Sequence, residues 1–185
     1  SKMQSNILWG IPLYSSDAEI HDQIVGKNGA FNRLIEGLNH LFSAGTQVEL
    51  RTVLMRQNAT NLPKLAEFIS THLPWIEIWA IMQLENIGYA RMNWNNIFFD
   101  NSVEFTPVQM GLTVASSRNI NVALYNFPLC TLPETHRGYA HASISDWKKK
   151  YLDFCSDCVD KLDCCGVFEW HTEKRGFAKL TPVIH

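Results

Sequence analysis

The sequence has 185 residues, 46% of them hydrophobic and 18% charged, which suits one globular domain with a small addition. Sixteen basic against eighteen acidic residues give a net charge of −2, so no strong positive field favours nucleic acid or an anionic membrane surface. No apolar run approaches the roughly 20 residues of a transmembrane helix, and no signal-peptide pattern is present. We therefore expect a cytoplasmic protein with no nucleic-acid or membrane partner.

Residues 1–127 alternate short apolar runs with helical patterns. Strands are predicted at residues 6–13, 47–55, 76–82 and 120–127, and helices at 17–25, 31–42, 61–69 and 106–115. In the second helix, apolar residues recur at steps of three and four, the spacing of one buried helix face: Phe31, Leu34, Ile35, Leu38, Leu41 and Phe42. This alternation predicts an α/β fold in which crossover helices connect parallel strands.

The pattern changes from residue 128 onward. Residues 128–145 contain prolines and polar residues and are predicted to form a loop. A helix is expected at 145–154, then a cysteine-rich segment, and a closing strand at 177–184. We therefore divide the chain into a domain over residues 1–127 and an extension over residues 128–185.

The predicted strand at residues 47–55 carries two charges on one face. Glu49 and Arg51 alternate with Val48, Leu50 and the residues that continue the apolar face. Strands of parallel sheets are usually apolar on both faces, so the pair indicates a sheet edge, a polar barrel interior or a ligand surface. A structural salt bridge is the alternative. Ligands of such folds lie beyond the carboxyl ends of the strands, here residues 12–17, 55–58 and 83–90.

The five cysteines all lie at or after residue 130. Cys155-x2-Cys158-x5-Cys164 places three thiols close in sequence, and Cys130 is the candidate for a fourth ligand. Such a set suits a tetrahedral zinc site or an iron–sulfur cluster. Cys165 is predicted to be a spare, because adjacent side chains diverge. Buried free thiols, a disulfide and a redox CxxC pair are the alternatives.

Several motifs resemble the late strands of a radical S-adenosylmethionine (radical SAM) barrel. They are Ile20-His21-Asp22, Gly29-Ala30-Phe31, the segment 48–54 (VELRTVL), Asn58 and Glu85-x-x-Gly88-Tyr89-Ala90. The tail, with Tyr125-Asn126-x-Pro128-x-Cys130 and Cys155-x2-Cys158-x5-Cys164-x-Gly166-Val167-Phe168, is similar to the auxiliary-cluster (SPASM/twitch-like) extension of that superfamily. Within the superfamily, the chain resembles the maturases of His-Xaa-Ser peptide systems.

The resemblance implies the second half of a partial (β/α)6 TIM-like barrel with a small Cys-rich extension that binds an auxiliary 4Fe-4S cluster. The substrate would be a ribosomally made peptide. The CxxxCxxC motif of the catalytic cluster is absent, so the chain is expected to be a C-terminal fragment, or a short gene product, that is inactive alone. Its expected partner is the missing N-terminal barrel half or a second copy of itself. The alternative function is a zinc-stabilised binding module without catalysis.

The resemblance also suggests which residues bind S-adenosylmethionine. Ser15 ends the segment Pro12-Leu13-Tyr14-Ser15, which stands where the family often has Ser-x-Asp-Gly and departs from it, and Val25 stands where an arginine is frequent. Arg51 is the candidate for the cofactor's carboxylate, because guanidinium binds carboxylates bidentately. Gln83 and Glu85, at the end of the next strand, are candidates for the ribose or the substrate. Three further polar residues of these motifs are expected to cap helices or turns: His21, Asp22 and Asn58.

Overall fold

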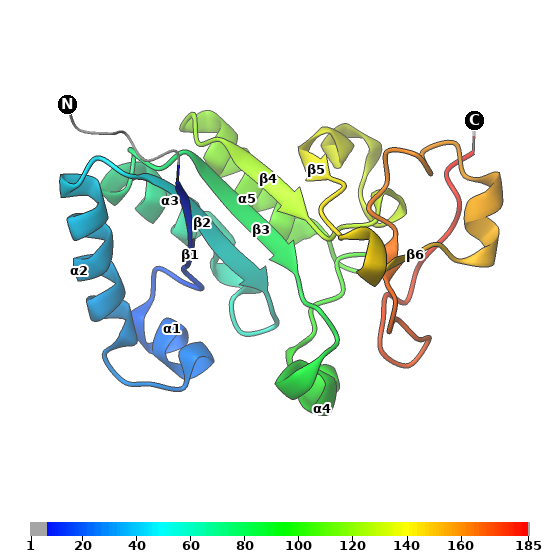
Figure 1. Cartoon of the computed structure of the whole chain (residues 1–185), viewed down its shortest axis with the longest axis horizontal. Coiled ribbons are helices and arrows are strands. Elements are labelled where there is room, and N and C mark those ends of the chain that lie inside the picture. Colours follow the sequence, from blue (N-terminus) through cyan, green and yellow to red (C-terminus); the bar gives the residue numbers. More distant parts are fainter. Residues whose placement is uncertain (1–6, 185) are drawn as a thin grey trace.

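The computed structural model describes residues 7–184 and confirms the α/β fold class (Figure 1). Five strands form one parallel sheet whose spatial order is the chain order: β1 (Leu8–Pro12), β2 (Gln47–Leu54), β3 (Ile78–Gln83), β4 (Val122–Tyr125) and β5 (Ala140–His141). The first four strands match the predicted ones. Asn6, where the first was expected to begin, lies outside the described residues. The fifth strand lies in the part that the sequence assigns to the extension.

Five helices connect or follow the strands: α1 (Ala18–Val25), α2 (Ala30–Ser43), α3 (Leu62–His72), α4 (Gly88–Ile97) and α5 (Thr106–Ser117). Helix α4 was not predicted from the sequence. It buries only Trp94 and Ile97, and Asn93 interrupts it with non-helical dihedral angles. Because it lacks a continuous apolar face, its sequence gives no helical periodicity to detect.

Helices α3 and α5 pack behind the sheet in Figure 1 and cover one of its faces. The side chains of β2 and β3 that point toward them form the core: Val48, Leu50, Leu54, Trp79 and Ile81. Trp79 is fully buried, and its indole N–H donates to Thr52 Oγ1 over 2.9 Å. The Thr52 hydroxyl in turn donates to the Leu13 carbonyl over 2.6 Å. This hydrogen-bonded chain links β3, β2 and the residue that follows β1.

The opposite face of the sheet is turned toward the viewer in Figure 1, where no helix covers it. Register places Arg51 beside Ala80, and Ala80 beside Ala123, on this open face. Glu49 and Tyr125 share the face because side chains alternate along a strand. The sheet is therefore covered by helices on one side only, as expected for part of a (β/α) barrel.

Two predictions for the extension were wrong. Residues 145–154 were expected to be a helix but form a 3-10 turn (Asp146–Lys148) and then β6 (Lys149–Lys150). Strand β6 pairs antiparallel with β7 (Val167–Phe168), so pairing with a distant segment overrides the local helical pattern. Residues 177–184 were expected to be a strand but have no regular structure. Their backbone N–H groups are used elsewhere: those of Ala178, Lys179 and Val183 donate to Asp100 Oδ2, Ser102 Oγ and Cys158 Sγ.

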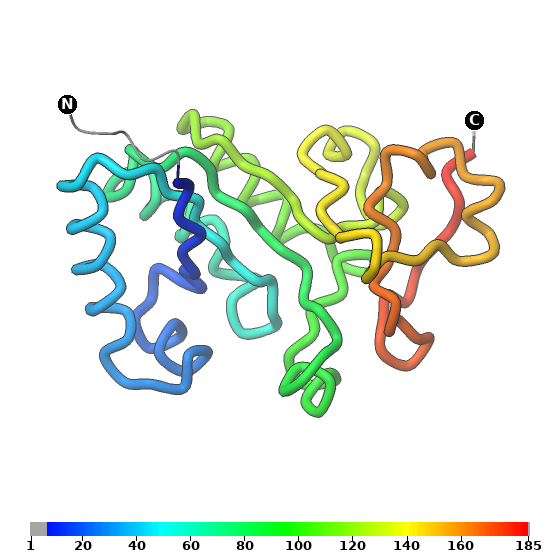
Figure 2. The backbone as a smooth tube through the Cα atoms, viewed as in Figure 1, coloured from blue at the N-terminus to red at the C-terminus, as the bar shows by residue number. Residues whose placement is uncertain are grey.

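Figure 2 shows the extension as a set of loops beside the last strands of the sheet. Three contacts fix it there: the two N–H donations to Asp100 and Ser102, and an ion pair of 3.3 Å between Lys148 Nζ and Glu85 Oε1. Within residues 7–184, no helix is long and apolar enough to cross a membrane.

Asp22 closes the loop between α1 and α2, as the cap interpretation predicts. Its carboxylate accepts the N–H of Phe31 at 2.8 Å and that of Gly29, which adopts a φ of 72°. The hydrogen bond from the Phe31 N–H lowers the pKa of this carboxyl, and the bond from the Gly29 N–H lowers it by a smaller amount. A carboxyl with a lowered folded-state pKa stabilises the protein above its unfolded pKa, about 3.9, and loses this effect as the pH falls through the folded value.

We expect Asp22→Asn to lower the melting temperature at pH 7, because the amide keeps the shape but loses the charge that strengthens both bonds. The difference from wild type should shrink as the pH falls from about 5 to about 2. Differential scanning calorimetry across this range measures it, with the exposed Glu36→Gln as the control. A difference that is constant with pH would contradict the ionic contribution.

Candidate cysteine centre and strand-end cleft

The four predicted cysteine ligands line one cavity within the extension. Cys130 lies in the 3-10 turn Leu129–Thr131, which follows β4, and Cys155 and Cys158 lie in and just after the turn Asp153–Asp157. Cys164 comes from the segment that leads into β7. All are free thiols. Folding thus brings together cysteines that are up to 34 positions apart (164 − 130).

Backbone N–H groups point at two of these sulfurs. Cys164 Sγ accepts from the N–H of Leu129 at 3.3 Å and from that of Gly166 at 3.4 Å. Cys158 Sγ accepts from Val183 N–H at 3.4 Å. Gly166 has a φ of 67°, and a Cβ there would lie 2.7 Å from the Lys150 carbonyl oxygen, so only glycine fits this turn. N–H donors of this kind stabilise thiolates and tune iron–sulfur clusters.

The thiols of the cavity differ in their proton affinity. Burial raises the pKa of Cys130 to about 12. A hydrogen bond from the Cys165 thiol, together with the two N–H donors described above, lowers the pKa of Cys164 to about 6 despite burial. Lys150 and Lys161 also line the cavity and bring positive charge to it. The surroundings therefore favour the thiolate at Cys164, whereas burial raises the pKa of Cys130 and Cys155 and favours their protonated forms.

Cys165 lies behind the cavity rather than in it. Its side chain is buried, with 2% exposed, and its thiol is 3.2 Å from the Gly166 carbonyl oxygen. The structure therefore places Cys164, and not Cys165, among the residues that line the cavity, in line with the divergence of adjacent side chains.

Four cysteine thiols are suitable ligands for an iron–sulfur cluster or a zinc ion. In this structure, however, the cavity that they line is too small to hold a cluster. In the part of the chain that the structure describes, no three His, Cys, Asp or Glu side chains converge well enough to hold an ion. The cavity itself encloses about 20 Å3, little more than one water molecule requires. Cluster binding therefore requires the cysteine side chains to rotate outward.

The charged face of β2 contains a salt bridge. Arg51 Nε donates to Glu49 Oε1 at 2.5 Å, and the Tyr125 hydroxyl donates to Glu49 Oε2 at 3.3 Å. The Glu49 side chain is 6% exposed and that of Arg51 is 49% exposed. Gly10 makes room for the guanidinium, because a Cβ there would lie 2.6 Å from Arg51 Cζ. Burial, and then the charge of Glu49, raise the pKa of Tyr125.

The other three predicted cofactor contacts belong to separate hydrogen-bond networks. Ser15 is fully buried, and its hydroxyl donates to Asn61 Oδ1 at 3.0 Å. Gln83, 2% exposed, points to the helix-covered side and donates to Asn101 Oδ1 at 2.6 Å. Glu85 is the carboxylate that pairs with Lys148 of the extension. The structure does not bring these three side chains together with Arg51 in one site.

A cleft of about 510 Å3 lies at the carboxyl ends of β1 to β3, between α1 and α4. Sequence reasoning pointed to these strand ends but not to the cleft, because α4, which forms one of its walls, was missed. Its lining contains no charged residue: Tyr14, Gln23, Ile24, Val25, Gly26, Val53, Met55, Gln57, Leu84, Tyr89, Ala90 and Ile97.

The cleft lining does not fit S-adenosylmethionine. The cofactor carries a charged amino-carboxylate, which needs ionic partners when it is taken out of water. Arg51, the arginine predicted for this role, is paired with Glu49 and is not among the lining residues. This cleft is therefore not a site for that cofactor.

No known protein family and no curated protein matches the sequence. Among solved structures, the chain is similar to a domain of pyruvate-formate lyase-activating enzyme from Bacteroides vulgatus ATCC 8482. The TM-score is 0.47 at 13% sequence identity, and the match covers 63% of this chain and 66% of that domain. The chain thus spans just under two thirds of the solved domain.

Proposed function

We propose that this chain is the C-terminal part of a radical SAM enzyme that modifies a ribosomally made peptide, and that its cysteines bind an auxiliary 4Fe-4S cluster. The observation that carries the proposal is the single cavity lined by Cys130, Cys155, Cys158 and Cys164. The N–H donors aimed at two of the sulfurs and the two lysines beside them support it further. A cluster bound there would position the substrate or accept an electron.

The proposal assigns residues 1–127 to the barrel part and residues 128–185 to the cluster-binding extension. Because the CxxxCxxC motif is absent, we expect this chain alone not to cleave S-adenosylmethionine. The guanidinium of Arg51 is paired with Glu49 through Nε, and its half-exposed side chain could still contact an anionic group of the substrate on the open face. The resemblance to the maturases of His-Xaa-Ser systems suggests the class of peptide.

Strand β1 is the edge at which a partner would join. In the described residues it pairs with β2 alone, and Leu8 and Trp9 are 48% and 45% exposed. An unpaired edge with apolar side chains is a template for another strand. We propose that the missing barrel half, or a second copy of the chain, occupies it.

A zinc-stabilised binding module is the second candidate. Its support is the scarcity of regular structure in the extension, where β6 and β7 have two residues each. A structural zinc ion supplies folding free energy where the local core is small.

The metal content of anaerobically purified protein tests the proposal. We expect roughly four irons and four acid-labile sulfides per chain. Cys158→Ala should lose them, whereas Cys165→Ser, which changes a side chain outside the cavity and keeps a hydrogen-bond donor beside Cys164, should retain them. One zinc and no sulfide would favour the binding module. Iron retained by Cys158→Ala and lost by Cys165→Ser would contradict the assigned ligands.

A further inference from the structure

The strand-end cleft is built as a ligand site. It lies beyond the carboxyl ends of three parallel strands, where ligands of parallel α/β folds bind. Its volume of about 510 Å3 falls within the range of pockets that hold small molecules or peptide side chains. Helices α1 and α4 project on either side of it in the lower part of Figure 1.

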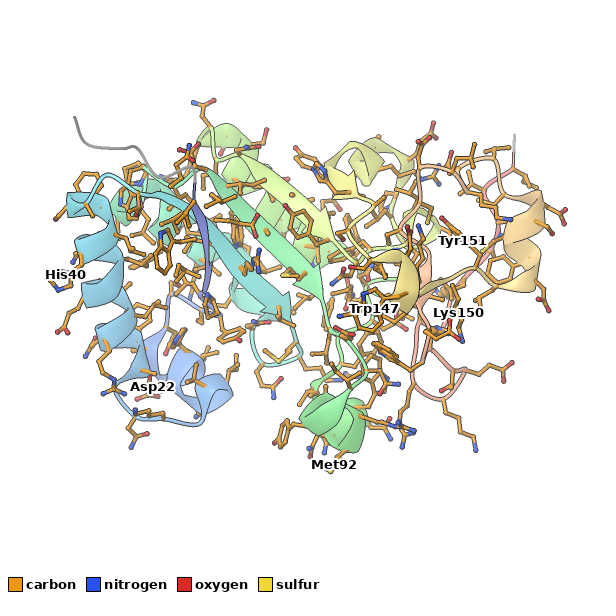
Figure 3. All side chains as sticks on the ribbon, in the orientation of Figure 1. Asp22, His40, Met92, Trp147, Lys150 and Tyr151 are labelled. Atoms are coloured by element: carbon orange, nitrogen blue, oxygen red, sulfur yellow. The ribbon has the colours of Figure 1, made fainter. Side chains whose placement is uncertain are left out.

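The floor and walls of the cleft are apolar. Val53 and Met55 come from the end of β2, Leu84 follows β3, and Ile97 comes from the last turn of α4. The rim exposes further apolar surface, with Tyr89 71% and Val25 44% exposed. This apolar surface continues along α4 to Met92, which is 78% exposed and projects from the helix in Figure 3. Water would leave such a surface when an apolar group enters.

The polar groups of the cleft are uncharged. Gln23 and Gln57 are exposed amides, each able to donate and accept hydrogen bonds. Burial raises the pKa of the Tyr14 hydroxyl, which keeps it neutral. Helix α1 ends at the rim with Val25 and Gly26 and has no basic residue in its last turn. The negative end of its dipole therefore opposes an anionic ligand.

We propose that this cleft binds an uncharged, apolar segment of a peptide, with one aliphatic or aromatic side chain in the cleft and the backbone amides on Gln23 and Gln57. Two side-chain amides match the alternating donors and acceptors of a peptide backbone, and the apolar walls match its side chain. This inference rests on the proposed function for the peptide nature of the ligand, and it names the class of peptide segment that the site takes.

Methyl NMR of the full chain labelled at methionine Cε tests the proposal. Met55 lines the cleft, whereas Met110, 53% exposed on α5, does not. The uncharged probe N-acetyl-phenylalanine methylamide should shift the Met55 signal saturably and leave Met110 unchanged. N-acetyl-phenylalanine, which differs by its free carboxylate, should bind about tenfold more weakly.

Two matched variants sharpen the test. Val25→Arg places a cation at the rim. It should weaken binding of the uncharged probe about fivefold and strengthen binding of N-acetyl-phenylalanine, which carries a carboxylate. Val103→Arg changes a 55% exposed valine outside the cleft lining and should behave as wild type. Tighter binding of N-acetyl-phenylalanine or S-adenosylhomocysteine than of the uncharged probe to wild type would overturn the proposal. Equal, non-saturating shifts of Met55 and Met110 would do the same.

The NMR test of the cleft is independent of the metal analysis that tests the cysteine centre. The metal analysis counts iron, zinc and sulfide, whereas the NMR titration reports on the methyl group of Met55 in the cleft. A chain that binds the uncharged probe but no iron would retain the cleft proposal and overturn the cluster. A chain that binds iron but not the uncharged probe would support the cluster proposal and overturn the cleft proposal.

Discussion

Replacing Trp79 with alanine is expected to lower the free energy of unfolding by about 3–5 kcal/mol. The indole is fully buried at the centre of the sheet and packs in the core between β3 and the helices behind it. The substitution removes the largest fully buried side chain of the protein and opens a cavity. It also leaves the Thr52 hydroxyl without its indole donor. Urea denaturation followed by circular dichroism measures the loss.

Two controls separate packing from hydrogen bonding. Thr52→Val keeps the shape but leaves Trp79 Nε1 and the Leu13 carbonyl unpaired, which should cost about 1–3 kcal/mol. Trp147→Ala changes a tryptophan that is 74% exposed, and its effect should stay within about 0.5 kcal/mol. If Trp147→Ala destabilised the protein as much as Trp79→Ala, the packing argument would fail.

Replacing Cys130 with alanine is expected to have the largest effect on the cysteine centre. Cys130 lies between β4 and β5, whereas Cys155, Cys158 and Cys164 follow β5. Its loss removes the ligand that is held between two strands of the sheet, so metal affinity should fall by about 100-fold or more. Hydrogen exchange in Val167 and Phe168 of β7 should then accelerate, while exchange in β3 stays unchanged.

Cys165→Ser is the matched control for Cys130→Ala. It replaces a thiol that does not line the cavity and keeps a hydrogen-bond donor beside Cys164, whereas Cys130→Ala removes a thiol that lines the cavity. Metal content and hydrogen exchange should therefore follow the wild type in Cys165→Ser. Full metal content in Cys130→Ala would show that Cys130 is not a ligand and that residues 155–164 bind metal without it.

The predicted strands and the parallel sheet were confirmed because their signals are local. Each apolar run of four to eight residues is separated from the next by a periodic helix, as in β2 followed by α3. Helix α4 was not predicted because its apolar residues do not recur on one face. The extension was predicted wrongly because β6 forms only through pairing with β7, 17 positions later (Lys150 to Val167).

The residues of the candidate sites also divide into those with a local sequence signal and those whose contacts come from distant segments. The four cysteines of the cavity could be grouped from the sequence because three of them lie within ten positions. The hydrogen bonds of Ser15 and Gln83 could not be foreseen, because their partners Asn61 and Asn101 lie 46 and 18 positions away. The cleft could not be foreseen at all, because its walls come from several segments that meet only in the folded chain.

The agreement between strand order and chain order has a consequence for biosynthesis. Each strand pairs with the one that precedes it in the sequence, so the sheet can grow strand by strand as the chain leaves the ribosome. Strand β5 ends at His141, before Cys155, Cys158 and Cys164 are made. Cys130 is therefore held by a finished sheet when the other three thiols emerge. Under the proposed function, metal insertion would be the last step of maturation, and a chain without metal would keep a folded sheet and an incomplete extension.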